Sequence, residues 1–391
     1  MKLVSLACVG VALLATACTR QAEPKVVSAP LAADEYLKTA QGPVFDQARR
    51  LGRGVNLGNA LDAPKEGEWG ITLRDEDFAL VAEVGFDHVR IPVRWSAHAA
   101  SEAPFSIDPE FAARVKWAID SALGSGLRAI VNVHHYDEMA IEPDAHKARL
   151  IGIWKQIAES YQGYPDTLYF ELLNEPHDKL TPDKNNGLIS ELLTVVRATN
   201  PQRSVVVGGT EWNSFRGLPS LELPVSDQHL IVTIHYYDPF DFTHQGAEWA
   251  KKQDQLGIDW PGQVGTQRNI AVDFDRAVEW ARAHTRPLYL GEYGAYEKAE
   301  LGARTRWTTA VVTEADARAI PSAYWELRAS FGLYDLEKKQ WRRELLDAVL
   351  PSRGAQGTRP APASDAPLQP LPVPGATSSI AERSAPGSAR R

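Results

Sequence analysis

The sequence has few of the residues that stabilise small exported proteins or bind polyanions. Its two cysteines, Cys8 and Cys18, both lie in the first 18 residues of a 391-residue chain. The rest of the chain can form no internal disulfide, so its stability must come from packing. The 42 Lys and Arg residues are outnumbered by 50 Asp and Glu, which gives a formal net charge of −8. This balance argues against nucleic acid as a partner.

Several catalytic signatures are also absent. The sequence contains no GxGxxG or P-loop motif, no GxSxG elbow and no HExxH motif. Nothing therefore supports a dinucleotide-binding protein, an NTPase, a serine hydrolase or a zinc peptidase. Hydrophobic residues make up 44% of the chain, enough for a sizeable core. We expect a globular protein whose chemistry rests on residues scattered along the sequence.

The N-terminal residues resemble an export signal. Residues 1–18 contain one lysine, a short apolar stretch and then small residues. The segment Ala15-Thr16-Ala17 fits an ordinary cleavage site and, together with Cys18, also fits a lipoprotein site. We therefore expect an exported protein, whether an outer-membrane lipoprotein, periplasmic or secreted. Its only membrane link would be a lipid anchor at Cys18.

Composition also predicts the domain boundaries. Residues 351–391 hold 8 of the 26 prolines and no aromatic residue, and are interpreted as a disordered tail. Residues 19–33 are interpreted as a short tether. Residues 34–350 are left as one folded domain.

Apolar runs alternate with helical periodicity through this domain. Eight runs are interpreted as strands: 54–59, 88–93, 128–135, 168–176, 204–209, 230–237, 287–293 and 322–327. The predicted helices between them include 75–84, 109–123, 145–161, 189–199 and 274–284. Continuous apolar strands alternating with helices indicate parallel strands covered on both faces. Eight such units predict a single (β/α)8 TIM barrel, with a doubly wound open sheet as the alternative.

Seven of the eight predicted strands end in polar, ionisable or aromatic side chains. These are Asn59, Arg90 with Arg94, His134, His135, Asn174, Glu175, His235, Tyr237, Glu292 and Trp325. In a barrel, the loops after the carboxyl ends of the strands form the pocket. We therefore expect these side chains to meet at one rim, which packing alone would not require.

Glu175 and Glu292 are the central pair in this set. Glu175 ends the run FELLNEP and Glu292 lies in LGEYG. Two carboxyl groups across a pocket can divide the work of glycosidic hydrolysis, because one protonates the leaving oxygen while the other attacks or activates water. An exposed charge at a strand end would explain either residue alone, but is a poor explanation for both at matching positions.

The sequence resembles family 5 of the glycoside hydrolases, and most closely its bacterial endoglucanases, which often also cleave mannans. The resemblance extends from RGVNLGNAL (53–61) to FGLYD (331–335). Other matching segments are HVRIPVRW, VNVHHY, LNEP, IHYYDPFDFTHQGAEW, LGEYGAY and YWEL. The resemblance implies a retaining endo-β-1,4-glucanase that acts on β-1,4-linked polysaccharides or oligosaccharides. We expect it to need no cofactor and to be a monomer.

The resemblance also implies roles for individual residues. Glu175 matches the general acid/base and Glu292 the nucleophile, which in a retaining enzyme lie about 5 Å apart. Arg90 matches the arginine that keeps the nucleophile ionised. Asn174 matches the residue that binds the sugar 2-hydroxyl. His235 and Tyr237 match a pair beside the catalytic carboxyl groups.

Further residues match positions that line the substrate cleft. The predicted sugar contacts are Asn59, Asp62, His134, His135, His244, Trp249 and the stacking platform Trp325. Trp69, Trp95 and Trp212 are candidates for flanking subsites. Mannan-cleaving relatives tend to carry a glutamate where Asp62 stands, so mannan hydrolysis stays open.

The adjacent histidines His134 and His135 also raise the question of a metal. Successive strand residues point to opposite sides, and adjacent residues then make a poor chelate. We therefore expect sugar contacts and no metal site.

Two alternatives to glucan hydrolysis stay open, and a third is disfavoured. One is a β-mannanase, glucomannanase or other β-glucan hydrolase with the same site. Another is an inactive carbohydrate-binding barrel, which should lack a carboxyl group or the arginine. The third is an aldolase or isomerase on the same fold, which would call for a lysine or phosphate loop at the rim. None of the eight strand ends has a lysine.

Overall fold

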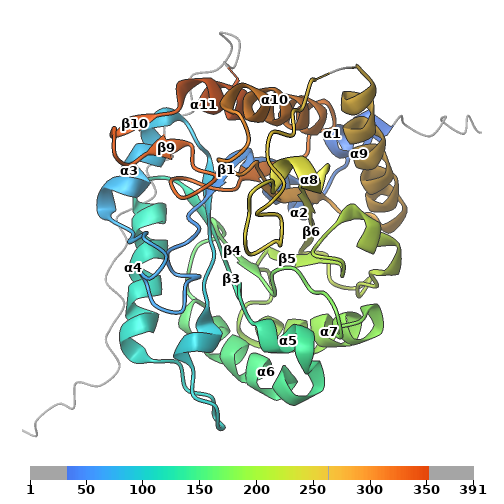
Figure 1. Cartoon of the computed structure of the whole chain (residues 1–391). Coiled ribbons are helices and arrows are strands. Elements are labelled where there is room, and N and C mark those ends of the chain that lie inside the picture. Colours follow the sequence, from blue (N-terminus) through green and yellow to red (C-terminus); the bar gives the residue numbers. More distant parts are fainter. Residues whose placement is uncertain (1–32, 263, 352–391) are drawn as a thin grey trace, which may run out of the picture.

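The computed structural model describes residues 33–351, with the exception of residue 263 (Figure 1). The predicted export signal, most of the tether and all but the first residue of the predicted tail lie outside the described residues. Among the described residues, no helix is long and apolar enough to cross a membrane.

Eight parallel strands close into one barrel in chain order, as predicted. The strands are β1 (Arg53–Asn56), β2 (His88–Ile91), β3 (Arg128–Asn132), β4 (Leu168–Glu171), β5 (Val205–Gly208), β6 (Leu230–Tyr236), β7 (Leu288–Tyr293) and β8 (Ser322–Tyr324). β8 pairs with β1 through Val55 and Tyr324, which closes the ring. The TIM barrel is thereby confirmed, and the open-sheet alternative is wrong.

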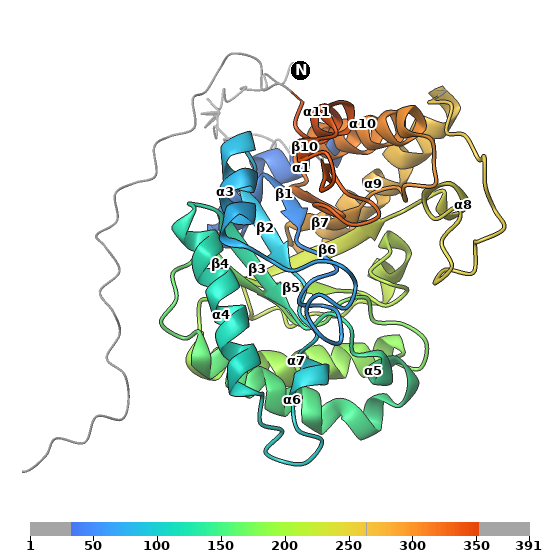
Figure 2. The same cartoon turned by 60° about the vertical axis from the view of Figure 1, so that its left-hand side comes forward.

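Helices surround the strands on all sides (Figures 1 and 2). They are α1 (Ala33–Thr39), α2 (Pro43–Leu51), α3 (Asp75–Val84), α4 (Pro109–Gly124), α5 (Asp137–Ile141), α6 (Pro143–Ser160), α7 (Pro182–Thr199), α8 (Phe240–Thr243), α9 (Val264–His284), α10 (Leu301–Ala317) and α11 (Arg343–Val349). Short 3-10 helices span Trp95–His98 and Phe215–Ser220, and a hairpin pairs β9 (Tyr334–Asp335) with β10 (Gln340–Trp341). α7 and α9 begin earlier than predicted. The residues of their first turns are mostly polar or small, so the sequence there shows no clear helical spacing of apolar residues.

The helix α4 illustrates how sequence fixes these elements. The Asp108 carboxylate accepts hydrogen bonds from the backbone N–H groups of Glu110 and Phe111, and Pro109 occupies the first turn. Val115 and Ile119 then recur on one face and are fully buried against the barrel. Burial of each such side chain contributes about 1.5–3 kcal/mol.

The strands end earlier than predicted at several places on the rim. β3 ends at Asn132 and β4 at Glu171, well before the predicted ends at 135 and 176. Beyond them the backbone turns over the barrel mouth: Glu175 has φ 47° and Asn59 has φ 63°, in the left-handed region that a strand does not use. Loops therefore carry part of the polar rim, while Arg90 lies on a strand.

A bulge between β6 and β7 aims the carboxyl group of Glu292. The pairing moves from Ile234 with Leu290 to His235 with Glu292, so Gly291 is skipped. A Cβ atom at Gly291 would lie 2.6 Å from the Thr233 hydroxyl, a contact too short for any side chain there. Such bulges redirect the neighbouring side chain. The result places Glu292 beside His235.

Candidate active site

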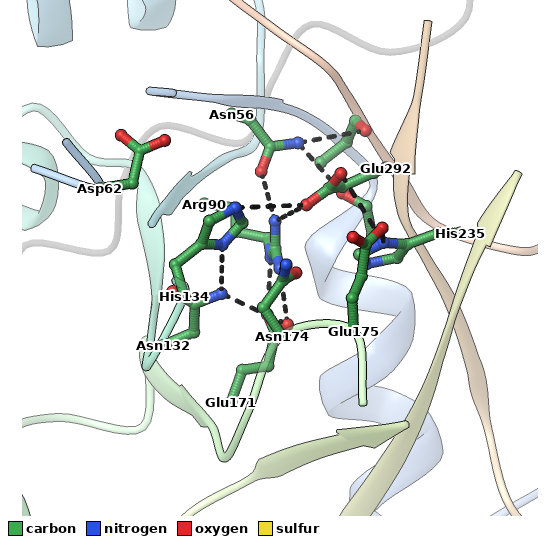
Figure 3. Close-up of polar contacts among 12 residues, drawn as sticks. Asn56, Asp62, Arg90, Asn132, His134, Glu171, Asn174, Glu175, His235 and Glu292 are labelled. Carbon is green, nitrogen blue, oxygen red and sulfur yellow. Dashed lines mark hydrogen bonds and ion pairs between the residues drawn. The ribbon is translucent and has the colours of Figure 1, made fainter. Parts of the chain in front are cut away.

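The carboxyl ends of the strands bring Glu175 and Glu292 together (Figure 3). His235 Nδ1 lies 2.8 Å from Glu175 Oε1 and 3.6 Å from Glu292 Oε2. One carboxylate oxygen of Glu175 lies within 4.8 Å of one of Glu292. This close approach fits the short spacing of about 5 Å between the carboxyl groups of retaining glycosidases.

Arg90 lies at the centre of the site and is fully buried. Its Nη1 donates to Glu292 Oε1 at 2.6 Å and to Asn56 Oδ1 at 2.9 Å. Its Nη2 donates to Asn174 Oδ1 at 2.8 Å. Nε and Nη2 together hold the two oxygens of Glu171, each at 2.6 Å. Figure 3 shows the guanidinium between Glu171 and Glu292. The arginine thus contacts two buried carboxylates at once.

Direct donors stabilise the charged form of Glu292. Burial raises its pKa, and the ion pair with Arg90 opposes that rise. The Tyr237 hydroxyl donates to Glu292 Oε2 at 3.0 Å. Burial lowers the pKa of His235 to about 4, so Arg90 is the cation that acts on Glu292 at neutral pH. These contacts suit a carboxylate that remains ionised.

Glu175 has a different environment. Burial raises its pKa to about 7. Among residues 33–351 without 263, no lysine or arginine contacts its carboxyl group directly, although Arg90 and His177 lower the pKa from a distance. Its side chain keeps 25% of its surface exposed to the cleft. With the Asn213 amide oriented to satisfy its neighbours, Asn213 Oδ1 accepts from the Glu175 backbone N–H at 3.2 Å. The site therefore holds two carboxyl groups whose pKa values burial raises, of which only Glu292 has a direct ion pair with Arg90 to oppose that rise.

The structure corrects the predicted orientation of His134 and His135. Their rings lie 4.6 Å apart and both line the cavity beside Glu175, instead of pointing to opposite sides. The strand rule fails here because β3 ends at Asn132. The His134 ring stacks on Trp325 with 5.4 Å between centroids and 4° between planes.

The tautomer of His134 follows from its hydrogen bonds. Its Nδ1 lies 3.0 Å from Asn132 Nδ2, which can only donate, so Nδ1 accepts and Nε2 carries the hydrogen. Nε2 lies 4.0 Å from Glu292 Oε1. Burial lowers the pKa of His134 well below its usual range, so the ring is neutral. A neutral donor therefore faces the Glu292 carboxylate.

Two groups in the described part of the chain bring three metal-ligand atoms within 4.8 Å of one another. They are Asp62 with His134 and His135, and Glu175 with His235 and Glu292. In the first group Asp62 already accepts from the backbone N–H groups of Asn59 and Ala60, at 3.0 and 2.8 Å. These are the residues that a cation entering the cleft would meet.

The remaining predicted sugar contacts lie on the loops after β1 and β6. Asp62 is buried, which raises its pKa to about 6, and it ties down the loop that carries Asn59. His244 stacks on Phe240 with 4.0 Å between centroids. Trp249 is 62% exposed and packs edge-on against Tyr296. A sugar chain could therefore reach Trp249 directly, whereas Asp62 mainly shapes the backbone.

The predicted flanking tryptophans divide into two kinds. Trp212 is 51% exposed, stacks on His177 and lines the cavity beside Glu175. Trp69 is 40% exposed and meets His135 edge-on. Trp95 is 1% exposed, and its indole N–H donates to the Asn132 carbonyl at 3.0 Å. The prediction of a subsite at Trp95 is therefore wrong, because this ring is part of the core.

Sequence reasoning missed three polar residues inside the strands, namely Asn56, Asn132 and Glu171. Asn56 Nδ2 donates to the carbonyls of Gly291 and Tyr324, at 3.0 and 3.2 Å, which ties β1 to β7 and β8. Glu171 is fully buried. A signal existed, because a carboxylate in an apolar barrel strand needs a buried cation as its partner.

Comparison with known proteins then defines the family. The family model "Cellulase (glycosyl hydrolase family 5)" matches residues 53–330. The chain belongs to glycosyl hydrolase family 5.

Individual family 5 proteins are similar over most of this chain. Endoglucanase H of Acetivibrio thermocellus is 32% identical over 314 residues, which cover 78% of this chain and 33% of that protein. The chain thus spans about a third of its length. Two Thermotoga maritima Cel5A structures, one in complex with mannotriose and one with cellobiose, are each 45% identical with a TM-score of 0.77. Each comparison covers 78% of this chain and 99% of the Cel5A chain.

Proposed function

We propose that this family 5 protein hydrolyses β-1,4-linked glucans by endo cleavage with retention of anomeric configuration. The observation that carries the proposal is the close approach of Glu175 and Glu292, with Arg90 in contact with only one of them. Such a pair suits an acid/base and a nucleophile. An inactive binding barrel would have no need of this arrangement.

In the first step, Glu292 is the nucleophile and Glu175 the acid. A Glu292 oxygen forms a bond to the anomeric carbon, and the glycosidic bond breaks. Its electron pair goes to the leaving oxygen, which takes the proton of Glu175. The pKa of about 7 keeps Glu175 largely protonated in mildly acidic solution, as this step requires. The product is a glycosyl ester on Glu292.

In the second step, Glu175 acts as the base. It takes a proton from a water molecule, whose oxygen attacks the anomeric carbon and releases the Glu292 carboxylate. Glu175 is then protonated again and Glu292 is charged. His235 Nδ1 lies near both carboxyl groups, so this histidine stays beside Glu175 and Glu292 through both steps of the reaction.

Neighbouring residues position the sugar in this proposal. Arg90 donates to Asn174 Oδ1, so the Nδ2 of Asn174 can donate to the sugar 2-hydroxyl. That contact strengthens as positive charge develops on the ring. Trp325 offers a flat surface for a sugar face, and His134, stacked against it, holds the indole in place.

A second candidate activity is cleavage of mannan or glucomannan. Its support is the T. maritima Cel5A structure in complex with mannotriose, which resembles this chain as closely as the complex with cellobiose does. Glucose and mannose differ at the 2-hydroxyl, the group that Asn174 would contact. The proposed partner is therefore a β-1,4-linked polysaccharide or oligosaccharide, with glucan as the first choice.

Product profiles on a panel of polysaccharides test the function. The full chain is incubated with soluble cellulose derivatives, mixed-linkage glucan, glucomannan and mannan. We expect short oligosaccharides and an early fall in viscosity from glucans. Glu175→Gln and Glu292→Gln should each fold and lose several orders of magnitude of activity. Near-normal turnover in either variant would contradict the assignment.

We also propose that the chain is exported and anchored through Cys18. The support is the signal-like sequence of residues 1–18. In a bacterial host that processes lipoproteins, the wild type should fractionate with membranes and label with palmitate. Cys18→Ser should abolish the label, and an unlabelled wild type would contradict the anchor.

A further inference from the structure

The strongest unassigned feature of the site is the buried carboxylate of Glu171. It ends strand β4, four residues before Glu175, and has no exposed surface. A group so buried cannot contact a sugar. Both of its oxygens instead bind Arg90 at 2.6 Å, and Asn132 Nδ2 lies 3.5 Å from Oε1. Its two short contacts are both with Arg90, so Arg90 is the main route by which Glu171 can act on Glu292.

We propose that Glu171 is a positioning residue that shares the charge of Arg90 and so preserves the nucleophilicity of Glu292. This inference rests on the proposed function of Glu292. Glu171 takes the bidentate edge of the guanidinium, Nε and Nη2, whereas Glu292 receives a single bond from Nη1. The paired geometry is the stronger one. Arg90 is thus oriented by Glu171 and presented to Glu292 with part of its charge already compensated.

The charge count supports this role. One guanidinium faces two carboxylates, so the trio carries a net charge of −1 when both are ionised. Inside a water-poor site, each carboxylate competes for the same cation. If Glu171 were neutral, the whole positive charge of Arg90 would act on Glu292. Glu292 would then be a weaker base and a weaker nucleophile.

Other groups near Glu292 leave this competition intact. The titratable and charged groups that act on Glu292 directly, or through its partner Arg90, are Arg90 from β2, His134 after β3, Glu171 and Glu175 from β4 and its loop, His235 and Tyr237 from β6 and its end, and Tyr289 from β7. Burial lowers the pKa of both histidines and raises that of both tyrosines, so all four are neutral near pH 7. The charges that act there belong to Arg90, Glu171 and the ionised fraction of Glu175.

Loss of the Glu171 charge should affect the two chemical steps in opposite directions. Attack by Glu292 should slow because its oxygen is less basic. Breakdown of the glycosyl ester should speed up because the same carboxylate is a better leaving group. The acidic limb of the pH profile of kcat/KM, which reports ionisation of Glu292 in the free enzyme, should move to lower pH.

The test compares Glu171→Gln with Glu171→Asp, using an aryl β-cellobioside as substrate. Gln keeps the size and removes the charge, whereas Asp keeps the charge and alters the reach. We expect the acidic limb of Glu171→Gln to move down by about one pH unit, and that of Glu171→Asp to stay in place while its rate falls. A purely structural role would lower the rate in both variants and move neither limb.

A second variant keeps the test decisive if Glu171→Gln does not fold. Asn174→Asp places a new carboxylate on Arg90 Nη2, at the partly open rim of the site. Its rate should fall because Asn174 contacts the sugar, but its acidic limb should move to higher pH. An unmoved limb in the folded variants would overturn the inference.

Trapping with a 2-deoxy-2-fluoro cellobioside separates this inference from the proposed function. The wild type should become labelled on Glu292. If it is labelled elsewhere or not at all, the assignment of the nucleophile fails. If Glu292 is labelled and the acidic limb still does not move in the variants, only the role of Glu171 fails.

Discussion

Removal of the Arg90 charge is the sharpest test of how the site is held together. In Arg90→Met, a side chain of comparable length replaces a guanidinium that is fully buried and bound to Glu171 and Glu292. Removal of one partner of a buried ion pair costs about 3–5 kcal/mol, because the other charge is left without compensation. The two ion pairs share one cation, so the free-energy costs of losing them will not be fully additive. We therefore expect the variant to lose at least about 3 kcal/mol of unfolding free energy at pH 7.

Arg94 provides a matched control four residues further along the chain. Its salt bridge to Asp137 spans 3.0 Å, but the Asp137 side chain is 62% exposed. An ion pair of this kind contributes about 0–1 kcal/mol, so Arg94→Met should be nearly neutral. Both variants and the wild type are unfolded in guanidinium chloride, and the unfolding free energies are compared by linear extrapolation.

The cost of Arg90→Met should also depend on pH. Without the cation, two buried carboxyl groups are left with no positive partner, and burial then favours their protonated forms in the folded state. An acid with a raised folded pKa favours the folded state most when both states are protonated, and this advantage is lost as pH rises through the folded pKa. The deficit should therefore shrink from pH 7 to pH 4.5. A loss no larger than that of Arg94→Met, or one that is independent of pH, would refute the reasoning.

Two further predictions concern Glu175. Its folded pKa of about 7 lies above the ordinary glutamate value of 4.5, so Glu175 favours folding below pH 4.5 and loses that contribution as pH rises through 7. Glu175→Gln should therefore gain about 3 kcal/mol relative to the wild type between pH 4.5 and pH 8, as measured by denaturant unfolding, and an unchanged difference would contradict the raised pKa. In kinetics, Glu175→Gln should retain far more of its activity on an aryl glycoside with a good leaving group than on glucan, because such a leaving group needs little protonation. Equal losses on both substrates would argue against Glu175 as the acid.

The barrel and its paired carboxyl groups could be predicted because the information is local and repeated. Each apolar strand with the helix after it has its own periodicity, and eight such units have one compact closed arrangement. Once the barrel is assumed, residues as distant as Glu175 and Glu292 must share a rim. The closeness of the two carboxyl groups therefore follows from the barrel itself.

The predictions that were wrong concern side chains just beyond the end of a strand, where the backbone leaves the hydrogen-bonded sheet. Strand alternation predicts opposite orientations for His134 and His135, but β3 ends at Asn132 and both rings face the same cavity. Trp95 resembles the exposed tryptophans in sequence, but the short 3-10 helix after β2 turns it into the core. Neither outcome follows from residue type.

Glu171 shows a different kind of failure. It lies in FELLNEP, three residues before Asn174, and strand alternation places its side chain inside the barrel. The pattern of an apolar strand that ends in a catalytic residue does not predict a second acid within the strand. The structure shows that the strand carries two acids with different partners, Glu171 on Arg90 and Glu175 on His235.

The anomeric configuration of the first product tests the central claim most directly. Hydrolysis of a soluble cello-oligosaccharide by the full chain is followed by proton NMR before mutarotation is complete. If Glu175 and Glu292 act as acid/base and nucleophile across their short separation, the new reducing end appears first as the β-anomer. Initial release of the α-anomer would mean inversion, and would contradict the proposed roles of both residues.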